Sequence, residues 1–134
     1  MAFTTSTCGY TRHLAHRSMP DAKAAVVEAL KKEGFGVLTE IDVKETFKKK
    51  LDVEFRDYVI LGACNPPLAH QALSNELEVG LLLPCNVCLW SEGDGVTVAV
   101  VRPDALFTLV GKPAVEPIAR QVDEKLRRAL DAVA

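Results

Sequence analysis

The sequence of 134 residues lacks a long hydrophobic run, a strong charge of either sign and a secretion signal. Its apolar stretches, such as residues 79–84, are far shorter than the ~20 residues of a membrane-spanning helix, so we expect no membrane partner. A net charge of −2 creates no global field for polyanions, and we expect no nucleic-acid partner. The N-terminus has no basic region followed by an apolar stretch, which favours a cytoplasmic protein.

Motifs of common enzyme classes are also absent. The sequence has no phosphate-binding loop, dinucleotide-binding glycine motif, nucleophile elbow, zinc-protease helix or EF-hand loop. Four cysteines in a chain without a secretion signal are expected to be reduced thiols. The sequence therefore assigns no reaction and no cofactor, and it does not decide between an enzyme and a binding module.

What the sequence does contain suits one ordinary domain over residues 1–134. Hydrophobic residues make up 49% and charged residues 25%, which is enough material for a single core. Residues 1–9 are small and polar, and we expect them to form a loose N-terminal arm. No linker, repeat or low-complexity tract divides the remainder.

Helix and strand signals alternate along the chain. Ser18 and Pro20 predict a helix start, Asn65 before two prolines predicts a helix that runs to about Glu78, and an amphipathic helix follows Pro113. In that last helix, Asp123 and Arg127 form one of three acid–base pairs expected on the wet side. Strands are predicted over residues 10–16, 36–41, 58–63, 86–91 and 96–102, with a hairpin turn at 93–95. The prediction is an α+β single-domain sandwich: an antiparallel-rich sheet of about five strands with helices on one face.

A short helix is predicted over residues 44–50. Val43, Phe47 and Leu51 recur every four residues and share one face, while four lysines lie largely off that face. We favour a solvated lysine face over an anion-binding patch, because such runs usually keep a helix soluble.

Cys85 and Cys88 form a CxxC motif, which suggests a redox pair or half of a zinc site. Their surroundings read as a strand, where a separation of three points the side chains to opposite faces with Cα atoms ~10 Å apart. A disulfide needs Cα atoms within ~7 Å, and no second ligand pair accompanies the motif. The spacing therefore argues against a working CxxC.

Cys64 is the more informative thiol, since it lies between a predicted strand and a predicted helix start. Free N–H groups at a helix start stabilise a thiolate and can hold an anionic ligand, and Asn65 adds a side-chain amide. The alternative is that Cys64 packs as a small buried hydrophobe. Both interpretations stay open at this point.

Whether Cys64 and Cys85 meet depends on strand direction. A parallel arrangement of residues 58–63 and the strand from Asn86 would place the two cysteines at opposite ends of the sheet. The returning segment 80–84 could instead bring them together. We therefore predict a ligand-binding site at Cys64, Asn65 and Cys85, with or without a metal ion.

Three segments resemble the domain-of-unknown-function 302 family: ALKKEGFGVLTEIDVKETFKKKL, YVILGACNPPLAHQAL and GLLLPCNV. The resemblance implies an α+β fold similar to a TATA-binding-protein-like arrangement, and often a dimer. Cys64 and Cys85 occupy the cysteine positions of its ACNP and LPC motifs. The family has no established activity, so the resemblance transfers no catalytic role to any residue.

Three functional hypotheses follow. The leading one is a cytosolic, homodimeric, non-enzymatic module that binds a small molecule, an anion or a metal near Cys64, Asn65 and Cys85. The second is an enzyme-like protein in which Cys64 is the nucleophile of sulfur transfer or thiol redox chemistry. The third is an interaction module whose dimer surface comes from residues 44–51 and an edge strand.

Overall fold

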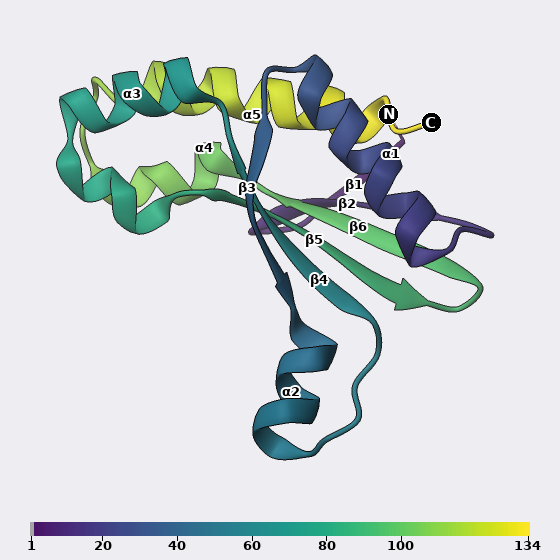
Figure 1. The fold of residues 1–134 in the computed structure, drawn as a ribbon. Helices are drawn as coiled ribbons and strands as arrows, with labels where there is room; N and C mark the ends of the chain where they lie inside the picture. The colour runs from purple at the N-terminus through teal and green to yellow at the C-terminus, as the bar shows by residue number, and fades with distance from the viewer. Residues whose placement is uncertain (1) are drawn as a thin grey trace.

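The computed structural model describes residues 2–134, which form one antiparallel sheet with helices on one side (Figure 1). The sheet has six strands in the order β1-β2-β6-β5-β4-β3. The strands are β1 (Thr4–Thr5), β2 (Gly9–Leu14), β3 (Gly36–Asp42), β4 (Tyr58–Cys64), β5 (Cys85–Glu92) and β6 (Gly95–Val101). The helices are α1 (Met19–Lys32), α2 (Val43–Leu51), α3 (Pro66–Asn75), α4 (Pro103–Leu106) and α5 (Glu116–Asp131), with 3₁₀ segments η1 (Leu77–Leu82) and η2 (Phe107–Val110).

The predicted α+β fold with an antiparallel sheet is confirmed, but the expected number of strands was too low. The sixth strand, β1, comes from the segment expected to be a loose arm. It pairs with β2, and the hydroxyl groups of Thr4 and Thr11 lie 2.9 Å apart. The amide of Ser6 donates to the carbonyl of Gly9, which closes the turn between the two strands. Met1, the first residue of the predicted arm, lies outside the described residues.

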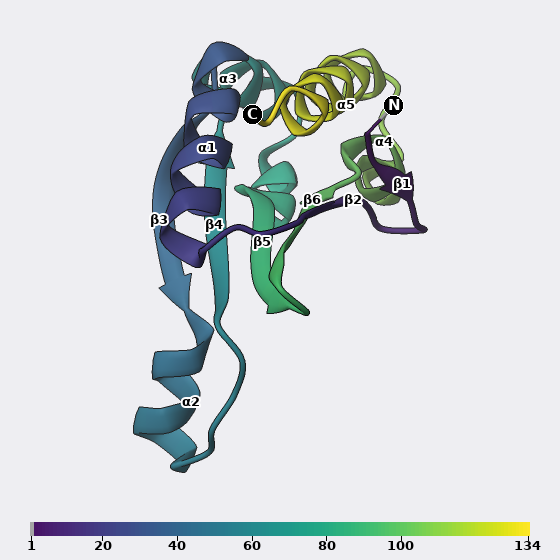
Figure 2. The same ribbon diagram turned by 90° about the vertical axis from the view of Figure 1, so that its right-hand side faces the viewer.

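One face of the sheet carries the core. Helices α1 and α5 pack on this face, and α3 packs against α5 (Figure 2). Alternate residues of β5 and β6 point toward the helices and are buried, namely Val87, Leu89, Val96, Val98 and Val100. The opposite face has no helix layer over it (Figure 2), and we call it the open face.

Both predicted helix caps are present. The Ser18 hydroxyl accepts from the amide of Asp21, and the Asn65 side-chain oxygen accepts from the amide of Leu68. The helix after Asn65 is shorter than predicted, because it ends at Asn75 and Glu76 has an extended backbone. The chain then forms η1, which anchors itself through the fully buried Val79.

The C-terminal helix α5 differs from the prediction at Asp123. This residue was placed on the wet side, yet it is only 4% exposed. Its ion pair with Arg127 forms at 2.9 Å, but the carboxylate also accepts from the hydroxyl of Tyr10 at 2.8 Å. A partner from β2 thus holds Asp123 inside the protein, which helical spacing alone does not reveal.

Helix α2 stands away from the rest of the molecule (Figures 1 and 2). With the loop that follows it, it forms the α2 protrusion, residues 43–57. No residue of α2 is buried. Within residues 2–134, no helix has the length and apolar character needed to cross a bilayer.

Candidate functional site

The structure brings the predicted site residues Cys64 and Cys85 together. Strands β4 and β5 are antiparallel, and Ala63 pairs directly with Cys85. The end of β4 and the start of β5 therefore lie side by side, and both thiols line one crevice. The parallel arrangement that would have separated them does not occur.

The helix start beside Cys64 offers no free amides, which removes the reason for expecting a stabilised thiolate. Pro66 and Pro67 occupy the first two positions of α3 and have no N–H group. The amide of Leu68 donates to Asn65 Oδ1 at 3.3 Å, and that of Ala69 donates to the Asn65 carbonyl at 2.9 Å. The expected row of unpartnered donors is therefore used up within the helix start itself.

Asn65 has a second structural contact. Its side-chain nitrogen donates to the carbonyl of Glu33 at 3.3 Å, just after α1 ends. One buried amide thus caps α3 and ties it to the end of α1. Both polar ends of this side chain are occupied by the protein's own backbone.

The crevice beside the two thiols is small and apolar. Its volume is about 20 Å³, and its other walls include Phe35, Leu68 and Phe107. A cavity needs ~10–15 Å³ to hold one water molecule, so this space fits a water molecule and excludes larger ligands.

Burial also disfavours ionisation of Cys85. The residue is 5% exposed. Desolvation, with a smaller contribution from the charge of Cys64, raises the pKa of Cys85 to about 12. Cys85 is therefore a protonated thiol at neutral pH. Within residues 2–134, no three His, Cys, Asp or Glu side chains gather in a way that could hold a metal ion.

The other half of the CxxC motif faces the opposite way, as predicted. Cys88 pairs with Ile60 on β4 and Ala99 on β6, on the open face. Cys85 lies on the core side of the same strand. No disulfide joins any cysteine within residues 2–134.

The open face contains a groove that the sequence analysis missed. Its volume is about 370 Å³, and we call it the sheet groove. Tyr58 and Trp90 stack at its wall, with ring centroids 5.6 Å apart and planes 11° apart. Other walls come from β2 and β6, including Thr11, Ala99 and Val101. The stack continues into the α2 protrusion, since Phe55 packs against Tyr58 and Phe47 packs against Phe55.

The sheet groove is uncharged at neutral pH. No Asp, Glu, Lys, Arg or His lines it. Burial, and then hydrogen bonding to Cys88, raises the pKa of Tyr58 to about 12. Burial also raises the pKa of Cys88, although its hydrogen bond with Tyr58 opposes that shift. Both groups are therefore protonated and neutral.

A signal for this groove was present in the sequence. An antiparallel strand with one solvated face normally alternates apolar and polar residues. In β5, Val87 and Leu89 face the core. On the other side of the strand, where polar residues are expected, Cys88 and Trp90 are largely apolar. Apolar character on both faces of one strand indicates that the outer face also has a partner.

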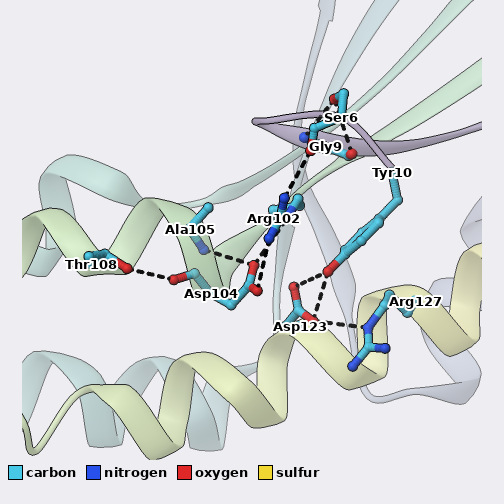
Figure 3. Close-up of polar contacts among 9 residues, drawn as sticks. All are labelled: Ser6, Gly9, Tyr10, Arg102, Asp104, Ala105, Thr108, Asp123 and Arg127. Carbon is cyan, nitrogen blue, oxygen red and sulfur yellow. Dashed lines mark hydrogen bonds and ion pairs between the residues drawn. The ribbon is translucent and has the colours of Figure 1, made fainter. Parts of the chain in front are cut away.

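A polar cluster fastens β2 and the start of α4 to α5 (Figure 3). The Arg102 guanidinium donates twice to the Asp104 carboxylate, each time at 3.2 Å. It also donates to the carbonyl of Ser6 at 3.0 Å. On the other side of the cluster, Tyr10 and Arg127 both donate to Asp123. These contacts join segments from the two ends of the chain.

The two carboxyl groups of this cluster shift in opposite directions. Burial raises the pKa of Asp123; the hydrogen bond from Tyr10 opposes this, and the charge of Asp104 adds to it. Burial alone would raise the pKa of Asp104 as well, but its hydrogen bonds, with that from Arg102 foremost, lower it. Within residues 2–134, every buried side-chain polar atom of the cluster has a hydrogen-bond partner. The cluster therefore stabilises the fold.

The lysines of α2 are largely neutralised by neighbours. Lys44 pairs with Asp57 at 3.5 Å, Lys48 pairs with Asp52 at 2.9 Å, and Lys49 pairs with Glu45 at 2.6 Å. A solvated face with local ion pairs describes these side chains better than an anion-binding patch.

Comparison with known proteins adds a family. The sequence pattern of the family described as "Domain of unknown function DUF302" matches residues 10–133. The chain belongs to the DUF302 family. This confirms the predicted resemblance, and the family description states no activity.

A solved structure supports the same assignment. The crystal structure of an uncharacterised conserved DUF302 protein from Bacillus stearothermophilus is similar, with a TM-score of 0.86 and 31% sequence identity. The match covers 94% of this chain and 98% of that one. No curated protein matches this DUF302 sequence.

Proposed function

We propose that this DUF302 protein is a non-enzymatic binding module whose ligand site is the sheet groove. Its ligand is a small, neutral, largely apolar molecule with a flat ring. The observation that supports this proposal most directly is an uncharged groove of about 370 Å³ beside a stacked Tyr58–Trp90 pair. Small-molecule sites typically have volumes of ~300–1,000 Å³ and mostly apolar walls with a few polar groups.

Charge favours a neutral ligand. A charged group in the sheet groove would lose water without gaining an opposite charge, because the lining has none. The thiol of Cys88 and the amide of Asn86 supply the few polar contacts that orient a ligand. The stacked rings of Tyr58 and Trp90 provide a flat aromatic wall.

The site at Cys64, Asn65 and Cys85 remains the sequence-based alternative for a ligand or metal. In the proposal these residues instead close the core where β4 meets α3, because the crevice there is about 20 Å³. The predicted homodimer, the cytoplasmic location with reduced thiols and the TATA-binding-protein-like arrangement stay predictions.

The sole tryptophan makes the proposal testable. Trp90 emission is followed during titration with N-phenyl-1-naphthylamine, a neutral planar probe. We expect saturable quenching of Trp90 with a matching rise in probe emission. Ala99→Leu, which fills the groove, should weaken binding by at least about tenfold.

The control carries Leu77→Asn and Leu81→Asn, which remove exposed leucines far from the open face. Its affinity should equal that of the wild type. The proposal is rejected if quenching never saturates or if Ala99→Leu binds the probe as well as the wild type. It is also rejected if only the control with Leu77→Asn and Leu81→Asn loses binding.

Cys64 supports a second candidate, a sulfur-transfer role, because this residue is half-buried, whereas Cys85 is buried. Cys64 would take one sulfur atom from an inorganic polysulfide and leave a polysulfide one sulfur shorter. Intact mass after exposure to polysulfide tests this step. A Cys64→Ser variant with the same mass gain as the wild type ends this candidate.

A further inference from the structure

The sheet groove adjoins a second cleft on the open face. This cleft has a volume of about 470 Å³, and we call it the side cleft. Thr11 lines both the sheet groove and the side cleft. One row of paired residues also crosses from the first to the second, namely Tyr58, Trp90, Thr97 and His13 on β4, β5, β6 and β2. Neighbouring strands lie ~4.8 Å apart, so the side cleft begins one strand away from Trp90.

The side cleft differs from the sheet groove because it contains charged and polar groups. Glu92, His13 and Thr97 line it. The Thr97 hydroxyl donates to Glu92 Oε1 at 2.5 Å and lies 3.0 Å from His13 Nδ1. Thr97 is only 6% exposed, although it belongs to the side of β6 that no helix covers. The three side chains therefore form a hydrogen-bonded row directly beside the aromatic wall of the sheet groove.

Glu92 is charged at neutral pH and has acceptor sites to spare. The hydrogen bond from Thr97 lowers the pKa of Glu92, burial opposes this shift, and the hydrogen bond from Trp90 lowers the pKa further. A carboxylate ion has about four acceptor sites, and these two donors occupy two of them. Glu92 is an exposed residue, so its remaining sites are accessible to a ligand in the side cleft.

The proton on the Thr97 hydroxyl fixes the role of His13. The hydroxyl has one proton, and it donates that proton to the carboxylate of Glu92, which can only accept. His13 Nδ1 must therefore be the donor to the hydroxyl oxygen. In the neutral imidazole the other nitrogen, Nε2, is then an acceptor. It lies 3.9 Å from the nearest oxygen of Asp94, which is too far for a hydrogen bond.

The donors that line the side cleft are already engaged within the chain. The guanidinium of Arg12 donates to the carbonyls of Leu130 and Asp131 at 2.9 and 3.1 Å. The hydroxyl groups of Thr4 and Thr11 lie 2.9 Å apart and bind each other. A ligand that enters the side cleft therefore meets free acceptors rather than free donors.

We propose that the ligand of the sheet groove carries a hydroxyl group on its flat ring, and that this hydroxyl donates a hydrogen bond to Glu92 in the side cleft. Glu92 is the main acceptor, because hydrogen bonds to ionised groups are about twice as strong as those between neutral groups. His13 Nε2 adds a second acceptor, so a ring whose polar group can only accept is disfavoured. The inference rests on the proposed function, since it places the polar end of that ligand.

Two probes with the same ring system test the hydroxyl group. At pH 7, where a phenol stays protonated, 2-naphthol donates a hydrogen bond and 2-methoxynaphthalene cannot. Equilibrium dialysis of the full chain against each probe, with chromatography of both compartments, gives the two dissociation constants. We expect the wild type to bind 2-naphthol at least about tenfold more tightly. The methoxy probe is the more apolar of the two, so burial alone would favour the opposite order.

Two charge-matched variants of one hairpin locate the acceptor. Glu92→Gln replaces the carboxylate by a neutral amide and should reduce the preference for 2-naphthol to about threefold or less. Asp94→Asn is the control, because Asp94 pairs with His16 at 2.8 Å and lies outside the lining of the side cleft. It removes the same charge and should keep the tenfold preference. Circular dichroism of both variants checks that the fold is retained.

The outcomes separate this inference from the proposed function. Equal affinity of the wild type for both probes overturns the inference and leaves the sheet groove as a ligand site. A full preference in Glu92→Gln, or an equal loss in Asp94→Asn, overturns the assignment to Glu92. If neither probe binds the wild type, the proposed function fails and the inference fails with it.

Discussion

The junction of β4 with α3 and the open face are built from the same two strands, β4 and β5, yet they have opposite environments. At the junction, Cys85 and Asn65 are buried and their contacts are satisfied within the chain. Three and five residues after Cys85, on the open face, Cys88 and Trp90 border a groove of about 370 Å³. The cysteines and asparagine of the ACNP and LPC motifs close the core, while the residues that build the groove lie outside these two motifs.

This contrast follows from the two-residue period of a strand. Successive side chains point to opposite faces, so neighbours in sequence can serve different purposes. A cysteine beside a helix start suggests chemistry only if the helix leaves its first amides free. Here two prolines and one asparagine leave no amide free at the start of α3. The cysteine beside this helix start therefore belongs to a closely packed junction and not to a reactive site.

The largest expected difference between the two regions is in thiol reactivity. With its pKa raised from 9.0 to about 12, Cys85 should have about a thousandfold less thiolate at pH 8 than an unshifted thiol. Timed alkylation with iodoacetamide and peptide mass mapping would measure this. We expect Cys8, which is exposed, to react first, then Cys88, and Cys85 last.

The contrast would be broken if Cys85 in the folded protein reacted as fast as Cys8. Unfolding in guanidinium is the matched control, because all four cysteines should then react at similar rates.

Side-chain deletion should reveal the next largest difference. Leu89→Ala removes a fully buried side chain from the core face and should cost about 2–5 kcal/mol of unfolding free energy. Cys88→Ala, on the next residue, should cost less than about 1 kcal/mol, because Cys88 is only partly buried. Urea denaturation followed by Trp90 emission measures both. Equal losses would show that the open face is packed as tightly as the core.

The two tyrosines sharpen the comparison at alkaline pH. Burial raises the pKa of Tyr10, on the core face, and of Tyr58, on the open face, from 10.0 to about 12. The folded state therefore binds more protons than the unfolded state between pH ~10 and 12. Stability is present below this window and falls as pH rises through it.

Absorbance of tyrosinate at 295 nm measures this titration. Both tyrosines should ionise near pH 12 in the folded protein, and Tyr10→Phe or Tyr58→Phe should each remove about half of the change. A probe in the sheet groove should raise the apparent pKa of Tyr58 only. A folded-state transition near pH 10 would contradict the burial of both phenols.

The smallest expected effect concerns two asparagines. Asn65→Ala removes the α3 cap and the contact to Glu33, and should cost about 1–2 kcal/mol. Asn86→Ala, an exposed site on the open face, should change stability by less than about 0.5 kcal/mol. Thermal unfolding of both variants tests the pair. Equal losses would show that the Asn65 side chain does not stabilise the junction of β4 with α3.

Local chemistry explains which parts of the fold were predictable. Ser18 and Asn65 cap helices through contacts three residues away, and the 93–95 turn joins neighbouring strands, so short sequence windows contain both signals. The prediction was wrong for the N-terminal segment and for Asp123. The strand β1 forms only by pairing with β2, and its short sequence gives little sign of this pairing. Asp123 is buried because it accepts a hydrogen bond from Tyr10, which is distant in sequence.

The sequence by itself determined the fold class, the helix caps, the hairpin and the opposite orientation of Cys85 and Cys88, because these depend on residues within a few positions of one another. Only the tertiary structure decided that Cys64 and Cys85 share a crevice of about 20 Å³, and that Tyr58 and Trp90 stack beside an uncovered groove. Those outcomes depend on which strands pair, in which direction, and which face the helices cover. Such choices are made by the packing of the whole chain, and no short stretch of residues encodes them.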